Sequence, residues 1–503
     1  MRPAPMYFSP RIAFRCSLLL RVFGGALATA LISGCSGSAP QSPGSKLSGN
    51  TTVTILSTST ANDKFFQFSA TIETLTLTSQ SGKTVSLLTT PLNPEFMHLN
   101  GTAEPLATVS VPQDVYVSAA ATLGPTGFTC ATVGSNGTIL THAFVYDPVP
   151  ASDVTVSLPA PITIAGASMA LSLDLLVSQS GSYASCYASG ADPFTLTPTF
   201  SMTPMAVSAQ PANSSNGKLS GLEGIVALVN SSGNSLSVDS VELFNDGGVD
   251  PANGPTWQIT FNGSTVFQGI ADPSQLASGM AVDIDAALQE DGTLLATRIA
   301  VYDADATEVS LWSVPMLRMN TYGPQANVGA REGIGPLLVG DNSPIDFSNS
   351  TFNISGQLTN LSKLPFSVSF TGANMVAGQN IEPTFHLPGD FYPGDYGYPA
   401  TTVTLLPQVI NGTVSAIGSE GGFTTYTIAL APYDLFPALA VQQDQTTLLT
   451  DPSTVVVYAD DSTQMLNTSP VAVSGVVRFY GLVFNDNGTL RMDCAQINDG
   501  VTE

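Results

Sequence analysis

Basic residues are scarce in this sequence. Its 503 residues include 14 Lys and Arg against 38 Asp and Glu, which gives a formal net charge of −24 at pH 7. Binding to DNA or RNA depends on basic side chains that neutralise phosphates, so this charge argues against a nucleic-acid partner. An anionic membrane surface would repel the chain as well, so attachment to a membrane has to come from a lipid or apolar group.

Motifs of the common enzyme classes are also missing. The chain has three histidines, His98, His142 and His386, and any of them could in principle serve a Ser-His-Asp hydrolase as its base. However, there is no G-x-S-x-G elbow, no H-E-x-x-H zinc motif, and no Walker or G-x-G-x-x-G loop. We therefore expect ordinary strand histidines, no catalytic residue, and no nucleotide or other cofactor.

Five cysteines are present, and three of them bear on folding: Cys130, Cys186 and Cys494. Outside the cytoplasm Cys130 and Cys186 either form a disulfide or remain two separate buried thiols. Cys494 is left over and is expected to be unpaired and buried. No cysteine pair has zinc-ligand spacing, and acidic turns such as Asp460-Asp461 are read as solvated turns in preference to calcium loops, so no metal is expected.

What the sequence does contain is alternation. Hydrophobic residues make up 43% of the chain and charged residues only 10%, a balance that disordered chains do not have. Apolar residues recur with a period of two from Met169 to Val177, and Phe366, Val368 and Phe370 alternate with serines. Turn formers such as "SQSG" at 79–82 and "NDNG" at 485–488 separate these stretches. The pattern predicts an all-β protein.

One loop is unusual in composition. The stretch "FHLPGDFYPGDYGYPA", 385–400, combines aromatic rings and carboxylates with several Pro and Gly. Rings and acids together suit a sugar or a peptide, which makes this a candidate ligand loop; the alternative is a long hairpin connection whose tyrosines cover a barrel end. The candidate residues are Asp390, Phe391, Tyr392, Asp395, Tyr396 and Tyr398.

The first 35 residues have the plan of an export signal. Residues 1–21 carry four arginines and no acid, and the apolar segment after them, about a dozen residues long, is shorter than the roughly 20 needed to span a bilayer. Its end, Ile32-Ser33-Gly34-Cys35, resembles the lipobox of bacterial lipoproteins. That resemblance implies a signal peptide at 1–34, acyl chains on Cys35, and, with Ser36 following, an outer-membrane location. The alternative is a cysteine just past an ordinary cleavage site. Residues 35–50 then form a flexible Ser-, Gly- and Pro-rich tether.

The rest of the chain divides into domains by similarity. Residues 51–207, with "FSATIETLTLTSQSGKTVSLL" and "MALSLDLLV", resemble a transthyretin-like β-sandwich of bacterial lipoproteins. Three later segments resemble one another, most clearly in "DGTLLATRI" and "NGTLRMDCAQI", and resemble a family of small β-barrel domains of unknown function. That resemblance implies OB-like barrels of five or six strands at 222–303, 352–410 and 411–499. Neither resemblance implies a catalytic residue.

These observations favour a lipid-anchored cell-envelope protein with a binding or scaffolding role and no catalysis. Its expected partners are the membrane, through the lipid, and an envelope glycan or protein. Two alternatives stay open: a secreted hydrolase acting on polysaccharide or peptide, and assembly through exposed strand edges.

Overall fold

The computed structural model describes most of the chain from residue 47 onwards. The described residues are 47–60, 65–97, 99, 102–133, 139–146, 152–180, 197–205, 218–230, 234–240, 255–301, 309–319, 325–329, 332–334, 342–355, 361–386, 398–431, 435–440, 449–466 and 469–501.

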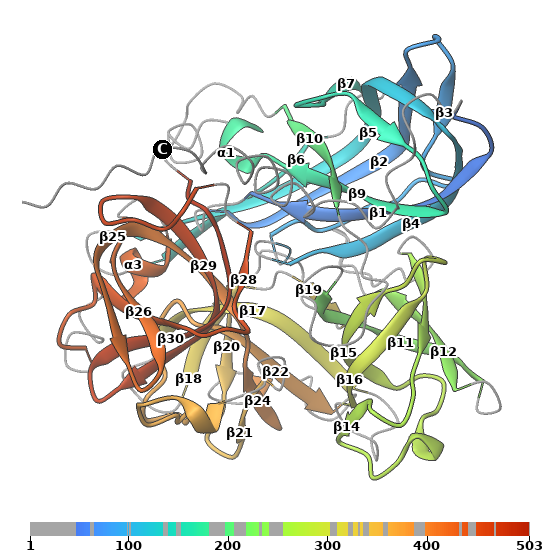
Figure 1. Cartoon of the computed structure of the whole chain (residues 1–503). Helices are drawn as coiled ribbons and strands as arrows, with labels where there is room; N and C mark the ends of the chain where they lie inside the picture. The colour runs from blue at the N-terminus through green and yellow to red at the C-terminus, as the bar shows by residue number, and fades with distance from the viewer. Residues whose placement is uncertain are drawn as a thin grey trace, which may run out of the picture. The chain divides into compact units, whose positions relative to one another are not determined.

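The fold is nearly all β, as the sequence predicts. The described residues form thirty strands in four sheets, and the helices among them are one-turn or two-turn pieces: α1 (Val177–Ser180), α3 (Leu435–Ala440) and the 3-10 turns η1 (Pro273–Gln275) and η2 (Leu361–Lys363). Strand arrows dominate the ribbon in Figure 1. In this part of the chain no helix has the length and apolar character needed to cross a bilayer.

The first sheet forms the N-terminal domain, which the sequence predicts as a β-sandwich and which we call the sandwich. Its strands run in the order β3-β2-β5-β7-β10-β9-β1-β4, with β6 and β8 also paired to β5. Of the stretch predicted to alternate from Met169 onwards, Leu171, Leu173 and Leu175 are fully buried in its core, but Ala170 and Ser172 between them are buried as well, so this strand is covered on both faces. The strands are β1 (Asn50–Ser59), β2 (Phe65–Ser79), β3 (Thr84–Ser86), β4 (Glu104–Pro112), β5 (Asp114–Val133), β6 (Ile139–Tyr146), β7 (Ser152–Ser157), β8 (Ile162–Ile164), β9 (Ser168–Leu175) and β10 (Phe200–Met205).

The second sheet closes into a small barrel. Its order is β13-β12-β11-β15-β16-β14, and an additional parallel pairing of β13 with β16 joins the third long strand to the fifth. If β11, β12, β13, β15 and β16 are numbered one to five, this is the closed 1-2-3-5-4-1 order of an OB-like barrel. The strands are β11 (Lys218–Asn230), β12 (Ser235–Ser240), β13 (Thr256–Thr260), β14 (Val266–Gln268), β15 (Ala281–Leu288) and β16 (Leu294–Val301).

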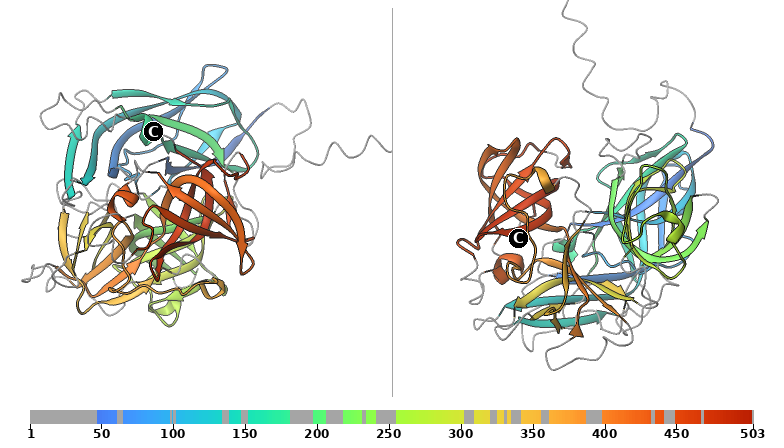
Figure 2. Two further views of the ribbon diagram at one scale, coloured as in Figure 1. Left: turned by 90° about the vertical axis from the view of Figure 1, so that its left-hand side faces the viewer. Right: turned by 90° about the horizontal axis from the view of Figure 1, so that it is seen from below.

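The fourth sheet repeats this topology strand for strand. Its order is β27-β26-β25-β29-β30-β28, and β27 pairs in parallel with β30 to close the barrel (Figures 1 and 2). We call the two structures the first and second barrels. The strands of the second are β25 (Gln408–Glu420), β26 (Phe423–Leu430), β27 (Thr454–Ala459), β28 (Gln464–Met465), β29 (Val476–Asp486) and β30 (Thr489–Asp499).

The register is repeated as well as the order. Gly224 of β11 lies opposite Val282, and Gly412 of β25 lies opposite Val477. In each barrel the pairing of the first two strands shifts directly after the residue two positions beyond that glycine. Both glycines are required by close approach, because a Cβ at either would lie within 2.5 Å of a carbonyl oxygen on the next strand.

The third sheet is built differently. Its order is β21-β24-β22-β17-β18-β20-β23, with β19 also paired to β17, and no pairing among its described residues closes it. It begins well before residue 352, and the expected boundary at 410 falls inside β25, because residues 408–413 pair with β29. The strands are β17 (Val309–Met319), β18 (Gln325–Gly329), β19 (Glu332–Ile334), β20 (Asn342–Asp346), β21 (Thr351–Ile354), β22 (Asn380–His386), β23 (Tyr398–Pro399) and β24 (Thr402–Leu405).

Neighbouring sheets share their cores. Leu56 and Ala170 of the sandwich belong to the apolar cluster of the first barrel, and Trp257 of that barrel donates from Nε1 to the carbonyl oxygen of Pro105 at 2.9 Å. Leu482 and Phe484 of β29 pack into the core of the third sheet. The β-sheets are therefore held by buried apolar surface as well as by the chain that links them.

Replacing Gly224 with Ala should destabilise the first barrel by about 1–3 kcal/mol, since the new Cβ would lie 2.5 Å from both Asp239 O and Val238 Cγ1. The unfolding midpoint of this barrel can be followed by the fluorescence of the buried Trp257 in a Trp312→Phe background. Gly263→Ala is the matched control, because a Cβ there meets nothing within 4 Å. Equal midpoints for the two variants would contradict the close packing.

Candidate functional site

The two barrels differ at one hairpin, and that difference builds the candidate site. In both barrels the last two long strands carry a register shift, after Asp285 in β15 and after Tyr480 in β29. Beyond the shift, β15 and β16 continue for three residue pairs, whereas β29 and β30 continue for six. The second hairpin therefore extends three pairs further, and these pairs carry Phe484, Asn485, Asp486 and Arg491.

The extended hairpin ends in a tight turn. Asp486 pairs with Thr489, so the loop has two residues, Asn487 and Gly488, with φ of +52° and +91°. Positive φ at both central positions defines the type I′ turn that Asn-Gly favours. The side chain of Asn485 supports the turn by accepting a hydrogen bond from Gly488 N at 2.8 Å.

Residues 361–370, which we call the covering segment, lie against the outside of the second barrel. Leu364 is buried with Phe423 and Tyr458, and the ring centroid of Phe366 lies 4.9 Å from that of Tyr458. The alternation predicted for this segment is present, with Phe366 and Phe370 turned inward and serines exposed. Residues 364–370 do not form the expected strand, because aromatic packing on the barrel takes the place of backbone pairing.

Arg491 links the covering segment to the hairpin. Its guanidinium carbon lies 5.4 Å from the ring centroid of Phe366 and 5.6 Å from that of Tyr458, within the range of cation–π attraction. Its Nε lies 2.8 Å from Asp486 Oδ2, an ion pair without an aligned N–H. Tyr458 also contacts Arg491 Nη1 and donates to Glu420 Oε2 at 2.8 Å.

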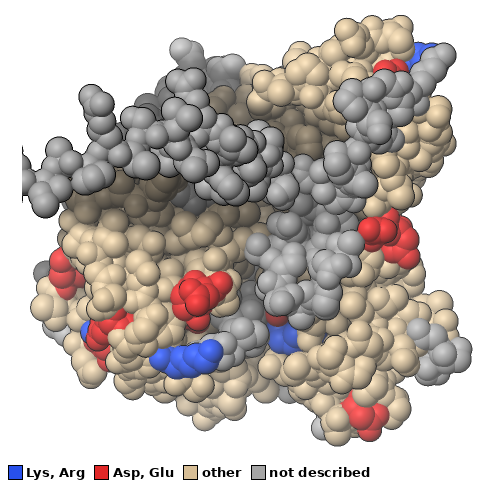
Figure 3. Space-filling model, viewed as in Figure 1, with Lys and Arg blue, Asp and Glu red and all other residues tan. Residues whose placement is uncertain are grey.

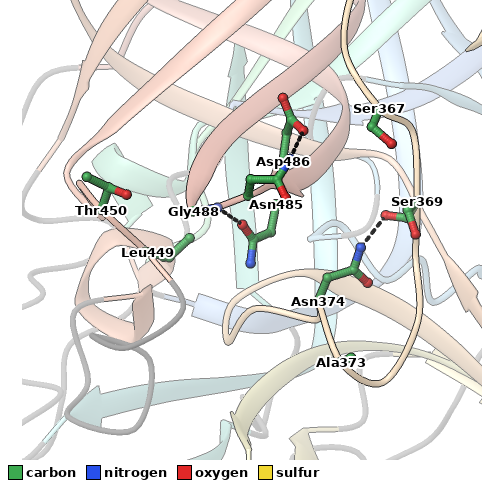
Figure 4. A pocket seen from close by; sticks show the side chains of 10 residues that line it. Ser367, Ser369, Ala373, Asn374, Leu449, Thr450, Asn485, Asp486 and Gly488 are labelled. Atoms are coloured by element: carbon green, nitrogen blue, oxygen red, sulfur yellow. Dashed lines mark hydrogen bonds between the residues drawn. The ribbon is translucent and has the colours of Figure 1, made fainter.

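A polar cleft of about 850 Å³ lies between the hairpin turn and the end of the covering segment. In Figure 4, Ser367, Ser369 and Asn374 form one wall, and Asn485, Asp486 and Gly488 face them, with Leu449 and Thr450 beside the turn. The lining residues are Ser367, Ser369, Ala373, Asn374, Leu449, Thr450, Asn485, Asp486, Asn487 and Gly488.

Hydrogen bonds hold both walls in place. Asn374 accepts from Thr371 N at 2.7 Å and donates to Ser369 O at 2.9 Å, which fixes the loop after the covering segment. On the opposite wall, Thr450 N donates to Gly488 O at 2.7 Å. The cleft is therefore lined by positions that the fold has already ordered before a ligand arrives.

The described lining contains one ionisable side chain. Asp486 is its one carboxylate, and Arg491 offsets its charge, whereas hydrolysis of a glycosidic bond uses two carboxyl groups across a cleft. Within the described ranges no three His, Cys, Asp or Glu side chains come together in a way that could hold a metal ion.

Most residues proposed from the sequence are not among those that the structure describes. Asp390, Phe391, Tyr392, Asp395 and Tyr396 of the candidate ligand loop fall outside the described residues, as do Cys35 and His98. Tyr398 is described: it pairs with Ile345 and packs against the core of the third sheet. His386 ends β22, opposite Val309.

The cysteines give one clear result. Cys186 lies outside the described residues, and Cys130 of β5 is paired with His142 of β6 in the sheet, so the expected disulfide stays a prediction. Cys494 is a buried free thiol, as the sequence predicts. Burial, together with the nearby charge of Asp493, raises the pKa of Cys494 far above its ordinary value, so the thiol is not a nucleophile at neutral pH.

The described residues of the first barrel form no counterpart of this site. Its β15 and β16 carry a buried ion pair instead, with Arg298 placed 2.6 Å from Asp283 and 2.7 Å from Asp285. Burial alone would lower the pKa of Arg298, but the two carboxylates outweigh burial and raise it, so Arg298 stays charged. Such a group is costly to bury without its partners, which suits a structural role.

The described outer faces of the two barrels differ in character. In the first barrel, Ser237, Asp239, Thr256 and Gln258 are the outward residues of β12 and β13, and Ser237 and Thr256 bond across the strands. In the second, Phe366 already stacks on Tyr458 and Arg491. Figure 3 shows a described surface that is mostly uncharged on the visible face, with acidic and basic groups in small separate clusters.

The cleft residues were not singled out by the sequence, although two signals pointed to them. The "NDNG" turn and the serines between Phe366 and Phe370 are both visible in the sequence, about 120 positions apart. What brings them together is the longer hairpin of the second barrel, and its length cannot be read from the turn alone. Aligned by their shared Gly-Thr-Leu, "DGTLLATRI" and "NGTLRMDCAQI" would match Leu294 with Leu490. In the sheets, however, Leu294 takes the position of Met492, two residues after Leu490.

Comparison with known proteins covers part of the chain. Residues 223–300 match the family described as a domain of unknown function (DUF5666), and this stretch begins in β11 and ends in β16. The matched stretch is therefore the first barrel. No curated protein matches the chain.

Among solved structures, the chain is similar to one titled Drosophila Unr CSD456. The identity is 12%, the match covers 56% of this chain and 98% of that one, and the TM-score is 0.12. A TM-score this low does not define a common overall fold, and the closed strand order of the barrels rests on their own pairings.

Removing the ring of Phe366 should free the covering segment. Phe366→Ala deletes the contacts with Tyr458 and Arg491, and trypsin should then cleave after Lys363 several times faster than in the parent chain. The rate is measured by mass spectrometry of timed digests. Ser362→Ala, an exposed position in the same segment, is the control. An unchanged rate in Phe366→Ala would show that the aromatic stack does not anchor the segment.

The carboxyl of Asp493 should make stability depend on pH. Burial, and then the nearby charge of Asp460, raise its pKa to about 6, above the 3.8 of a free aspartate. The folded chain thus holds this proton more tightly than the unfolded chain, so stability falls as pH rises from about 4 through 6. Asp493→Asn should remove this loss and be more stable at pH 7.5, by up to about 3 kcal/mol.

The measurement is the thermal midpoint of each protein between pH 4 and 8. Asp461→Asn, an exposed carboxylate in the neighbouring turn, is the control and should keep the pH slope of the parent. If Asp493→Asn keeps that slope too, the carboxyl is not protonated in the folded chain near pH 5.

Proposed function

We propose that this protein is a lipid-anchored cell-envelope protein with a binding or scaffolding role and without catalysis. The binding role rests on one observation, the preformed polar cleft between the covering segment and the β29–β30 turn. Its described lining offers hydroxyl and amide groups and one charge-compensated carboxylate, which suit recognition of a ligand and lack the paired groups of a hydrolase.

The location rests on the sequence. The Arg-rich start, the short apolar run and Ile32-Ser33-Gly34-Cys35 support lipid attachment at Cys35, and Ser36 supports the outer membrane. Two or three acyl chains hold a protein on a leaflet because each buried CH₂ contributes about 0.8 kcal/mol. The sandwich at 51–207 is, in this proposal, the transthyretin-like module nearest the anchor, and the barrels carry the binding surface beyond it.

Substitution of Cys35 tests the anchor. In cells fed an alkyne-labelled fatty acid, the parent chain should take up the label and its first tryptic peptide should begin with an acylated Cys35. Cys35→Ala should lose the label entirely, because no other cysteine follows a lipobox-like stretch such as Ile32-Ser33-Gly34. The readouts are gel fluorescence and mass spectrometry of that peptide.

Cys494→Ala is the matched control, since its thiol is buried at the far end of the chain, and it should keep the label. An unmodified thiol at position 35, in protein recovered from the cytosol, would contradict the anchor and leave the binding role to be judged separately.

A further inference from the structure

We propose that the polar cleft of the second barrel binds a neutral saccharide. This inference rests on the proposed binding role and deepens it by naming the class of ligand. It depends on three properties of the cleft: its charge, its hydrogen-bonding groups and its small apolar share.

The cleft is close to electrically neutral. Its described lining contains no Lys, Arg or His, and its one acid, Asp486, is paired with Arg491 at 2.8 Å. The other oxygen of Asp486 accepts from Asn487 Nδ2 at 3.0 Å. An anion would therefore meet no positive partner in the cleft, and the net charge of −24 would repel it further. A cation would meet the carboxylate of Asp486, which is already paired with the cationic side chain of Arg491.

The cleft is rich in neutral groups that are available to a ligand. In the described part of the chain, no hydrogen bond engages the hydroxyls of Ser367 and Ser369 or the side-chain nitrogen of Asn485. Asn485 is only 8% exposed, and its oxygen is committed to Gly488 N, so the donor end of the amide is fixed in direction. A sugar ring presents several hydroxyls that each donate and accept, and this set of donors and acceptors matches them.

Apolar and aromatic ligands fit less well. Of the ten lining residues, only Ala373 and Leu449 are apolar, and none is aromatic. Phe366, the neighbour of the lining residue Ser367, is engaged with Tyr458 and Arg491. A volume of about 850 Å³ is in the range of small-molecule sites and has room for a short oligosaccharide.

The test is calorimetric titration of the full chain, purified from the cells that express it. The neutral probes are maltohexaose, cellohexaose and chitopentaose; the others are polygalacturonate, as an anion, and a Ser- and Thr-rich hexapeptide. We expect at least one neutral oligosaccharide to bind with a Kd below about 1 mM, and neither the anion nor the peptide to bind.

Two variants locate the binding. Ser367→Ala with Ser369→Ala removes two exposed hydroxyls and should weaken binding at least about tenfold, as expected for two neutral hydrogen bonds. Asn485→Asp keeps the acceptor for Gly488 N but removes the donor, and should weaken it similarly. Ser110→Ala with Ser157→Ala, two exposed serines of the sandwich, is the matched control and should leave the affinity unchanged.

Failure to bind any of the three neutral probes overturns the saccharide assignment, and so does neutral-probe binding that the serine pair and Asn485→Asp leave intact. Binding of the peptide alone, lost in the cleft variants, would overturn it while supporting the general binding role. Because titration is done on purified protein, its outcome is independent of whether Cys35 carries a lipid.

Discussion

The parallel pairing of β27 with β30 is the constraint on which the C-terminal half of the structure depends. It closes the second barrel and sets the register Val457–Met492, which brings Tyr458 beside Asp493 and close to Arg491. A parallel pair needs a long connection between its strands, and here the chain between them supplies β28 and β29. With that register fixed, the hairpin can extend past the barrel wall only in one direction, toward the covering segment.

The comparison of the two barrels separates architecture from site. Closure order, the strand-one glycine and the two register shifts are shared, and these features account for the core of each barrel. The three additional residue pairs of the second hairpin have no architectural role in closing the barrel. They place Phe484 in the core of the third sheet and Asn485 and Asp486 in the cleft. A small change in strand length thus turns a structural module into one with a candidate binding surface.

Much of the fold follows from the sequence because strand alternation is a local property. The period-two pattern predicts the all-β class, the family resemblance implies the barrels, and "NDNG" predicts the turn that Asn487 and Gly488 form. The candidate site does not follow, because it depends on contacts between distant residues. Phe366 and Val368 alternate like strand residues, yet their partner is the outside of a barrel, and only the tertiary structure shows that Arg491 lies over the ring of Phe366.

Because Leu482 and Phe484 belong to the core of another sheet, they also affect the order in which parts of the chain can fold during synthesis. A chain is made from its N-terminus, and its domains generally fold as they emerge. The third sheet has all its strands by residue 405, but its core stays open until β29 arrives some 80 positions later. Until then this core lacks two of its ten buried apolar residues, Leu482 and Phe484, so this middle part of the chain is the one that would need a chaperone's protection during synthesis.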